Sequence, residues 1–220
     1  MRLTVCPLVS GSAGNSIYIS CGGVKLLVDC GVSAARVEAG LREIGVSVDD
    51  LDGILITHEH VDHVRGLGVL CRKHGVPVYA NEGTWNGIMA KDSRIPARCV
   101  RTFYTGEDFY IGDVNIHPFS IPHDALEPVG YAFSCKGLKC AVATDIGHIE
   151  STWIEAVSGC QALVLEANHD IDMVQMGPYP QRLKQRILGR NGHLNNEDSA
   201  KALLELEKTG TRAEIGRAHV

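Results

Sequence analysis

The 220-residue sequence lacks the long apolar runs and the basic excess that mark two large classes of protein. Although 45% of its residues are apolar, no stretch approaches the roughly eighteen consecutive apolar residues of a membrane-spanning helix. The formal net charge of -5 does not by itself indicate a surface for nucleic acid. The first residues carry no basic region followed by a long apolar segment, as a secretory signal would. We therefore expect a cytoplasmic protein with no membrane partner.

Several catalytic and redox signatures are also missing. The eight cysteines include no C-x-x-C pair, so we expect buried, reduced thiols without a disulfide partner. No G-x-S-x-G elbow is present, which removes the basis for a serine hydrolase of the α/β type. Residues 10–15 have the glycines of a tight loop but lack the Walker lysine and the Rossmann spacing, so taken alone they predict a turn.

One short segment, H-E-H-V-D-H at residues 58–63, carries three imidazoles and a carboxylate directly after an apolar run. Residues i and i+2 of an extended chain face the same side, so His58 and His60 can reach one ion as the strand ends. Apolar periodicity after this segment predicts a helix, whose first turn would aim Asp62 and His63 at a second ion. Imidazole suits zinc, and added carboxylate oxygens also suit manganese. The pattern therefore predicts two divalent metal ions, zinc or manganese.

The apolar pattern of the whole chain predicts a layered α/β protein. Strands are expected at residues 3–5, 16–20, 25–29, 53–57, 76–80, 108–111, 114–120, 130–134, 138–143 and 162–166. Helices are expected near residues 37–44, after residue 63, and at 85–89, 149–157, 182–188 and 197–207. Early strands with interspersed helices, then hairpins, then strand and helix again, are typical of stacked α and β layers.

The metal motif resembles the signature of the metallo-β-lactamase superfamily, whose fold is an αββα sandwich of two mixed sheets flanked by helices. The resemblance implies two further ligands downstream, His123 in I-P-H-D and Asp145 in A-T-D-I-G. It places the candidate ligands in two groups: His58, His60 and His123 around one ion, and Asp62 and His63 around the other, with Asp145 shared by both.

Longer blocks resemble one branch of that superfamily, the YycJ/WalJ type of DNA-processing hydrolase. These blocks are S-G-S-A-G-N at residues 10–15, H-D at 123–124, P-V-G-Y at 128–131, E-A-N-H-D at 166–170, G-P-Y-P at 177–180 and G-H-L-N-N-E-D at 192–198. They span nearly all of residues 1–212, which we expect to form one hydrolase domain. The resemblance implies a phosphodiester hydrolase that acts on DNA, as a 5′-to-3′ exonuclease in repair or processing.

The resemblance also implies roles for residues beside the ions. A hydroxide activated by the paired ions would attack phosphorus in line, with Asp62 orienting it. His193 would contact the scissile phosphate and protonate the leaving oxygen, although a helix-capping or buried structural histidine remains an alternative. His169 is expected to support a ligand or contact phosphate, and Asn15 to support the ligands from the wall of the cleft.

Three arginines, Arg182, Arg186 and Arg190, recur every four residues near the C-terminal part of the chain. On one helix they would form a basic stripe able to follow a DNA backbone, and we expect Arg182 and Arg186 to bind substrate. A solvated basic face with no ligand explains the same spacing.

The chain departs from the branch at its end. Members carry a final metal-binding histidine in an H-L-S-x-x-N block after one more strand, whereas residues 213–220 read A-E-I-G-R-A-H-V, with no hydrophobic strand pattern. We expect this segment to be a non-native tail, so that the last strand and helix of the fold are missing. His219 falls near the expected position by coincidence, and the second ion is expected to bind weakly.

Two other functions stay open at this point. A small-molecule hydrolase of the same superfamily, such as a thioesterase or lactonase like glyoxalase II, would cleave a thioester or lactone and be indifferent to DNA. A noncatalytic member would only bind a partner or nucleic acid, which the intact H-x-H-x-D-H set argues against. The sequence leaves the oligomeric state undetermined.

Overall fold

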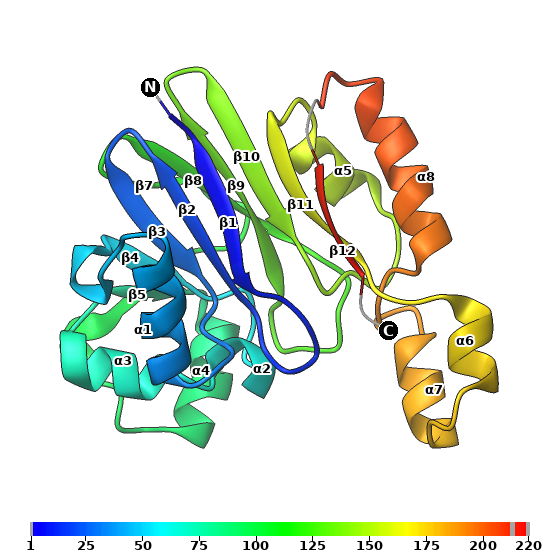
Figure 1. The fold of residues 1–220 in the computed structure, drawn as a ribbon, viewed down its shortest axis with the longest axis horizontal. Helices are drawn as coiled ribbons and strands as arrows, with labels where there is room; N and C mark the ends of the chain where they lie inside the picture. Colours follow the sequence, from blue (N-terminus) through cyan, green and yellow to red (C-terminus); the bar gives the residue numbers. More distant parts are fainter. Residues whose placement is uncertain (1, 212–213, 219–220) are drawn as a thin grey trace. The chain divides into compact units, whose positions relative to one another are not determined.

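The computed structural model describes residues 2–211 and, for the backbone, residues 214–218. The chain forms two compact units, one of Met1–Ile116 with Ala125–Glu127 and the other of His117–Asp124 with Pro128–Val220. We call them the first and second units. The described strands form two mixed sheets of six strands each (Figure 1).

The first sheet has the strand order β1-β2-β3-β4-β5-β6. Its strands are β1 Thr4–Val9, β2 Ser16–Cys21, β3 Val24–Val28, β4 Gly53–Leu55, β5 Val78–Ala80 and β6 Val100–Thr102. The pairs β1–β2 and β2–β3 are antiparallel, and the pairs from β3 to β6 are parallel. All of β4 and most of β3 is buried, as expected for parallel strands covered on both faces, which explains their apolar sequences.

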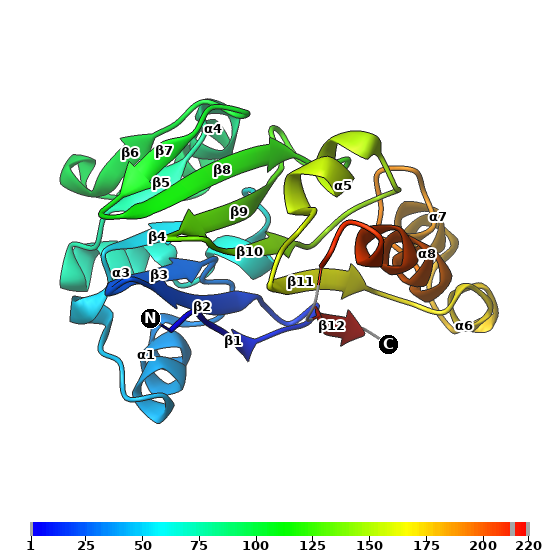
Figure 2. The same cartoon turned by 90° about the horizontal axis from the view of Figure 1, so that it is seen from above.

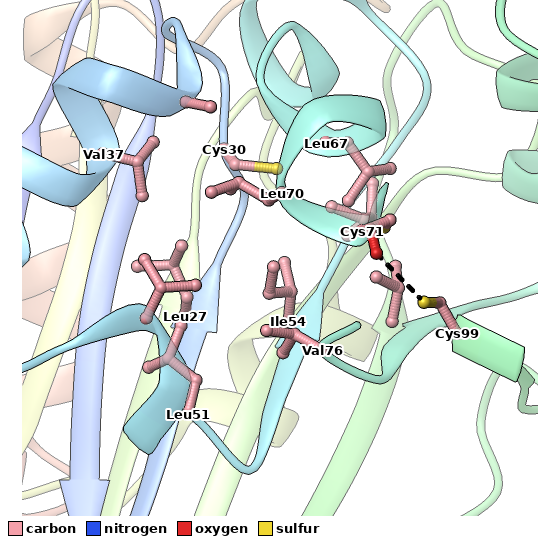
Figure 3. Close-up of a cluster of buried hydrophobic side chains, with 14 of the residues drawn as sticks. Leu27, Cys30, Val37, Leu51, Ile54, Leu67, Leu70, Cys71, Val76 and Cys99 are labelled. Carbon is pink, nitrogen blue, oxygen red and sulfur yellow. Dashed lines mark hydrogen bonds between the residues drawn. The ribbon is translucent and has the colours of Figure 1, made fainter. Parts of the chain in front are cut away.

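Helices of the first unit cover this sheet with a continuous apolar core (Figure 3). They are α1 Ala34–Glu43, α2 Val61–Val64, α3 Leu67–His74 and α4 Glu82–Lys91, with short 3-10 turns η1 Val48–Asp50 and η2 Ala97–Cys99. Helix α1 buries Val37 and Leu41, four residues apart, against Leu27 of β3 and Ile54 of β4 in this core. The core therefore fixes the ends of β3 and β4, where the candidate ligands begin.

The cysteines of the chain behave as small apolar side chains. All eight are free thiols, and all except Cys6 are buried. Burial raises the pKa of Cys71 to about 12 and that of Cys160 to about 11, so both thiols stay protonated at neutral pH. Because the thiolate is the reactive form, these cysteines have no catalytic character.

His74, the last residue of α3, links three elements of the first unit. Its Nδ1 lies 2.6 Å from Asp49 Oδ1 in η1, and its Nε2 lies 3.2 Å from Glu38 Oε1 in α1, which Lys73 also contacts at 2.9 Å. The hydrogen bond to Asp49 is the main cause that raises the pKa of His74, and Glu38 adds to it.

The raised pKa makes the stability contributed by His74 dependent on pH. The contribution is fully present below the pKa of an unfolded histidine, near 6.5, and is lost as pH rises through the higher folded value. We therefore expect His74→Gln to remove part of the fall in unfolding free energy between pH 6 and pH 9, measured by urea denaturation. An unchanged fall in the variant would contradict this assignment.

The second sheet has the strand order β12-β11-β10-β9-β8-β7. Its strands are β7 Phe109–Ile111, β8 Val114–Ser120, β9 Val129–Cys135, β10 Leu138–Ala143, β11 Ala162–Ala167 and β12 Glu214–Ala218. Strand β8 passes from the first unit into the second after Ile116. The pairs β7–β8 and β9–β10 are antiparallel, whereas β10–β11 and β11–β12 are parallel.

Helices of the second unit are α5 Ser151–Val157, α6 Ile171–Met176, α7 Gln181–Ile187 and α8 Asn196–Glu207. Helices α5 and α8 lie side by side, with α8 packed against β11 and α5 against β9 and β10 (Figures 1 and 2). They share a core that includes Trp153, Leu165 and Leu206. The side chain of Asn195 caps α8 by accepting a hydrogen bond from the Asp198 amide at 2.9 Å. This core holds the end of β11, where further candidate site residues follow.

Most elements expected from the sequence are present, with three differences. Strand β6, of sequence V-R-T, and helix α6, of sequence I-D-M-V-Q-M, were not expected from the apolar pattern of the chain. No strand was expected after Thr211, yet β12 pairs in parallel with β11 from Leu163↔Glu214 to Ala167↔Ala218. Parallel pairing uses backbone groups, so it does not require the hydrophobic alternation that this segment lacks. His219 lies outside the described residues.

Among the helices that the structure describes, none is long and apolar enough to cross a membrane.

Candidate metal centre

The first unit gathers three histidines of the 58–63 segment into one cluster, which we call the first cluster. His58 and His60 follow β4, and His63 lies in α2, whose first turn also carries Asp62. Nε2 of His58 lies 3.0 Å from Nδ1 of His60, and the rings of His58 and His63 have centroids 4.0 Å apart. His58 and His60 lie close together and a helix begins at Val61, as expected, while their binding of one ion stays a prediction.

A buried carboxylate, Asp29, organises the first cluster from behind. Asp29 follows β3, and its Oδ2 lies 2.8 Å from Nδ1 of His63. Because a carboxylate only accepts hydrogen bonds, Nδ1 of His63 carries the proton and Nε2 keeps its lone pair. Asp29 also accepts the amide and hydroxyl hydrogens of Thr57, both at 2.9 Å. The Thr57 hydroxyl in turn lies 3.0 Å from Nδ1 of His58, which can donate to it and leave Nε2 unprotonated.

The loop at residues 10–15 reaches the first cluster through Asn15. The Nδ2 of Asn15 lies 2.8 Å from Nε2 of His63 and donates to it, while Oδ1 accepts the Gly11 amide at 3.1 Å. The backbone amide of Asn15 donates to the carbonyl of Asp62 at 2.8 Å. Asn15 thus contacts the candidate ligand His63, and the role expected for it stays a prediction.

Gly31 fills a space beside this loop that no side chain can enter. Its amide donates to the carbonyl of Asn15 at 2.7 Å. A Cβ at position 31 would lie 1.5 Å from the carbonyl oxygen of Asp62 and 2.6 Å from the Asn15 nitrogen, both backbone atoms. The close packing of these three backbone segments therefore requires glycine.

We expect Gly31→Ala to displace the backbone at Asp62 and to lower both the unfolding free energy and divalent-metal affinity. A core overpacking of this kind costs about 1–3 kcal/mol, measured by urea denaturation. Gly40→Ala in α1 is the matched control, because its Cβ would meet only the Leu8 side chain, at 3.3 Å. Equal effects of the two substitutions would show that the packing at Asp62 does not matter.

The second unit gathers His123, Asp145 and His193 into another cluster, which we call the second cluster. Nδ1 of His123 lies 3.1 Å from the Gly192 carbonyl oxygen and donates to it, leaving Nε2 unprotonated. Asp145, after β10, has a left-handed backbone with φ 61° and a buried side chain. The rings of His123 and His193 have centroids 5.3 Å apart, and His193 Nδ1 lies 3.6 Å from Asp145 Oδ1.

Glu166, at the end of β11, joins the parts of the second cluster. Its Oε2 accepts the amides of Ile146 and Leu194 at 2.8 and 3.3 Å. Its Oε1 lies 2.8 Å from Nδ1 of His193 and accepts Nδ2 of Asn168 at 3.0 Å. One ligand atom from each of Asp145, Glu166 and His193 lies within 4.8 Å of the others, the spacing of a possible metal site.

The charge of Glu166 controls the protonation of His193. Burial alone lowers the pKa of His193, but the hydrogen bond to Glu166 and the charges of Glu166 and Asp145 outweigh it and raise the pKa to about 9. A protonated imidazole at neutral pH is the form that donates a proton. His169, in contrast, has its pKa lowered by burial.

The other residues of the second unit that were predicted to contact substrate are His169, Arg186 and Arg182. His169 is buried and its Nδ1 lies 3.3 Å from Oδ1 of Asn168, the residue that contacts Glu166. Arg186 in α7 makes two hydrogen bonds to the Asp124 carboxylate, at 2.6 and 3.1 Å. Arg182 is exposed on the same helix.

The expected stripe of three arginines on one helix is only partly present. Helix α7 ends at Ile187, so Arg190 lies beyond it, where its Nε is 3.3 Å from Nε2 of His148. Gly192, two residues after Arg190, packs so closely on the end of α7 that a Cβ there would lie 2.2 Å from the Arg186 carbonyl oxygen.

Asp29, Thr57 and Glu166 have supporting positions that the sequence analysis did not assign. Asp29 is a carboxylate that directly follows an apolar strand, and this pattern is the signal that could have identified it. Apart from Asn168, the partners of Asp29 and Glu166 given above are 20 or more residues away in the chain, and short-range patterns do not reveal them.

The donor sets of both clusters fit a divalent ion. Metal-binding histidines commonly donate their second ring N–H to a carboxylate or a carbonyl, as His63 does to Asp29 and His123 to Gly192. Nitrogen ligands around a tetrahedral zinc lie roughly 3.3 Å apart, close to the 3.0 Å between the nitrogens of His58 and His60.

Comparisons with known proteins agree with this chemistry. The family described as beta-lactamase superfamily domain matches residues 25–213. A protein of Bacillus anthracis named exodeoxyribonuclease YycJ is 42% identical over 206 residues, covering 94% of this chain and 78% of the relative. Exodeoxyribonuclease WalJ of Streptococcus pneumoniae is 41% identical over 199 residues, covering 90% of this chain and 74% of the relative.

A solved structure described as a new diphosphatase from the PhnP family has a TM-score of 0.72 to this chain at 20% identity, covering 100% of this chain and 87% of the other. This likeness confirms the predicted fold, the αββα sandwich of two mixed sheets. Family membership and the histidine and carboxylate clusters together support the binding of divalent metal. The chain belongs to the metallo-β-lactamase superfamily and is a protein of its YycJ/WalJ type.

Proposed function

We propose that this chain is a metal-dependent exodeoxyribonuclease that hydrolyses DNA in the 5′-to-3′ direction, in repair or processing. The observation that carries the proposal is the arrangement of hydrogen bonds that leaves Nε2 of His58, His63 and His123 unprotonated within each unit. Relatives at 41–42% identity named as exodeoxyribonucleases support DNA as the substrate. No specific feature favours a thioester or lactone.

The proposed ligand assignment follows the family pattern. Two divalent ions, zinc or manganese, would be held by His58, His60 and His123 on one side and Asp62 and His63 on the other, with Asp145 shared. When bound, such ions lower the pKa of water toward neutrality and offset the charge of a phosphodiester.

The chain's own side chains then have separate tasks. Asp62 would accept a hydrogen bond from the attacking water and orient it toward phosphorus. His193, held protonated by Glu166, would donate its proton to the leaving oxygen. Asp29 and Thr57 would fix the orientation of His63 and His58. Asn15 Nδ2 donates to Nε2 of His63, so this amide would have to move off that nitrogen when an ion binds there.

Substrate contacts are proposed for Arg182, Arg186, His169 and Asn15. The guanidinium of Arg186 is bonded to Asp124, so a DNA phosphate would have to compete with that carboxylate. His169, whose Nδ1 lies next to Oδ1 of Asn168, would contact the substrate through a ring nitrogen. Arg182 is free to meet a phosphate directly, since its side chain is exposed.

The test of the proposed function is an assay with end-labelled single-stranded and duplex DNA, with zinc, manganese or EDTA. A thioester and a lactone serve as control substrates. We expect DNA to shorten only when a divalent ion is present and the control substrates to stay intact. Turnover of a thioester or lactone without DNA cleavage would support the glyoxalase II-like alternative instead.

His193→Ala separates proton donation from metal binding. We expect the variant to lose about 10²- to 10⁴-fold in the rate of DNA hydrolysis, the usual contribution of a general acid. Bound metal, counted by mass spectrometry after dialysis, should be unchanged. A parallel loss of metal and activity would instead identify His193 as a ligand or as a residue needed for folding.

A further inference from the structure

The segment Ala125–Glu127, which belongs to the first unit, is held in place by hydrogen bonds on both sides. The carbonyl of Glu127 accepts Nδ2 of Asn81 at 2.8 Å, and its carboxylate accepts the Gly83 amide at 2.9 Å and the Thr105 hydroxyl at 2.7 Å. These contacts fix the segment on one side.

Glu59 fixes the same segment on the other side. It lies between His58 and His60, it is 7% exposed, and its Oε1 accepts the amide of Leu126 at 3.1 Å. Its Oε2 is buried and has no hydrogen-bond partner among the described residues. A buried carboxylate oxygen without a hydrogen bond costs free energy. Glu59 is nevertheless buried, and its Oε1 holds the Leu126 amide.

Helix α4 is shaped to accept both glutamates. A Cβ at Gly87 would lie 2.3 Å from Cγ of Glu59, and a Cβ at Gly83 would lie 2.6 Å from Cβ of Glu127. The two glycines are four residues apart and therefore share one helix face. Glycine in a helix interior lowers helix stability. At positions 83 and 87 it also lets Glu127 and Glu59 pack directly against the helix backbone.

The hydrogen bonds of Glu59 and Glu127 hold the segment with the apolar side chain of Leu126 exposed to solvent. Leu126 is 64% exposed, although its backbone is bonded to the residue between two candidate metal ligands. Single exposed leucines are common on surfaces, but the backbone of this one is held by the buried carboxylate of Glu59 on one side and by the hydrogen bonds of Glu127 on the other. A fixed backbone that carries an exposed apolar side chain is suited to binding an apolar group.

We propose that Leu126 packs against a nucleobase of the DNA strand being cut and that Glu59 is the positioning residue that holds it there. The inference rests on the proposed function, which supplies DNA as the substrate. A nucleobase is the apolar part of that substrate next to the cleaved phosphate, and an aliphatic side chain can lie on its face or wedge between two bases. Such a contact recognises the presence of a base and not its identity.

Binding without turnover tests the proposal first. Fluorescence anisotropy in EDTA compares a labelled single-stranded oligonucleotide with one that carries abasic units at both ends. We expect Leu126→Ala to weaken binding of the normal oligonucleotide about tenfold, since losing most of one apolar contact is worth about that factor. The abasic oligonucleotide should bind the variant and the unaltered chain equally. Leu204→Ala in α8 is the matched control, because Leu204 is 63% exposed.

Turnover supplies the second readout. In the presence of divalent metal, Leu126→Ala should raise KM for the normal oligonucleotide and change KM for the abasic oligonucleotide much less. Glu59→Ala should reproduce the DNA defect with unchanged bound metal, and Glu59→Gln, which keeps an acceptor oxygen for the Leu126 amide, should restore most of the binding.

The outcomes that overturn the proposal are distinct from failure of the proposed function. If the unaltered chain cleaves DNA and Leu126→Ala binds it as well as Leu204→Ala does, the inference about Leu126 is wrong and the proposed function stands. Equal losses on normal and abasic oligonucleotides would also overturn it, because they would indicate a structural role. If the unaltered chain neither binds nor cleaves DNA, both conclusions fall together.

Discussion

Asp29→Asn is expected to lower divalent-metal affinity about 10- to 100-fold, the usual effect of altering a group that orients a metal-binding histidine. The amide has one acceptor oxygen, which the Thr57 amide already occupies in the native arrangement. Its NH₂ group would face the Thr57 hydroxyl and Nδ1 of His63, both of which lie within 2.9 Å of Oδ2. His63 would then have to move its proton to Nε2 or rotate, and either change removes the lone pair from the ligand position.

The measurement is a zinc or manganese titration of the metal-free chain by isothermal calorimetry, together with urea denaturation without metal. Leaving a buried donor unsatisfied costs about 1–3 kcal/mol, so the unfolding free energy should fall by a similar amount. Asp172→Asn on α6 is the matched control, because Asp172 is exposed. Metal affinity equal to that of the control would rule out the role given to Asp29.

Glu166→Gln is expected to reduce DNA hydrolysis by 100-fold or more, within the range of about 10²- to 10⁴-fold for general acid catalysis. Glu166 accepts four hydrogen bonds, two on each oxygen. Glutamine has a single acceptor oxygen, so one pair of donors would face its NH₂ group. Either His193 loses its partner, or the Ile146 and Leu194 amides lose theirs and the loop that carries Asp145 shifts.

Steady-state kinetics on DNA and thermal denaturation of the same preparation measure both effects. Glu205→Gln on α8 makes the same chemical change at an exposed position and should behave as the unaltered chain. A Glu166→Gln variant with normal turnover would exclude Glu166 from the positioning of His193.

The first cluster was predictable because its residues are close in the chain. His58 and His60 are two residues apart at the end of a strand, and His63 lies in the next turn of helix, so local periodicity places all three. His123 and Asp145 came only from the family resemblance, since nothing in their local sequence separates them from other loop residues.

The supporting residues depend on long-range packing. Asp29 meets His63 across 34 residues and Glu166 meets His193 across 27, and each pair forms only because apolar cores hold two strand ends together. Strand β12 shows the same limit, because its pairing with β11 is set by backbone groups and leaves no pattern in its side chains.

The most direct test is a crystal structure of the full chain grown with zinc and measured at the zinc absorption edge. The account predicts anomalous-difference peaks next to Nε2 of His58 and Nε2 of His63, with His123 and Asp145 completing the coordination. Peaks only at other residues, or no peak in the presence of excess zinc, would contradict the claim that these side chains form a metal centre.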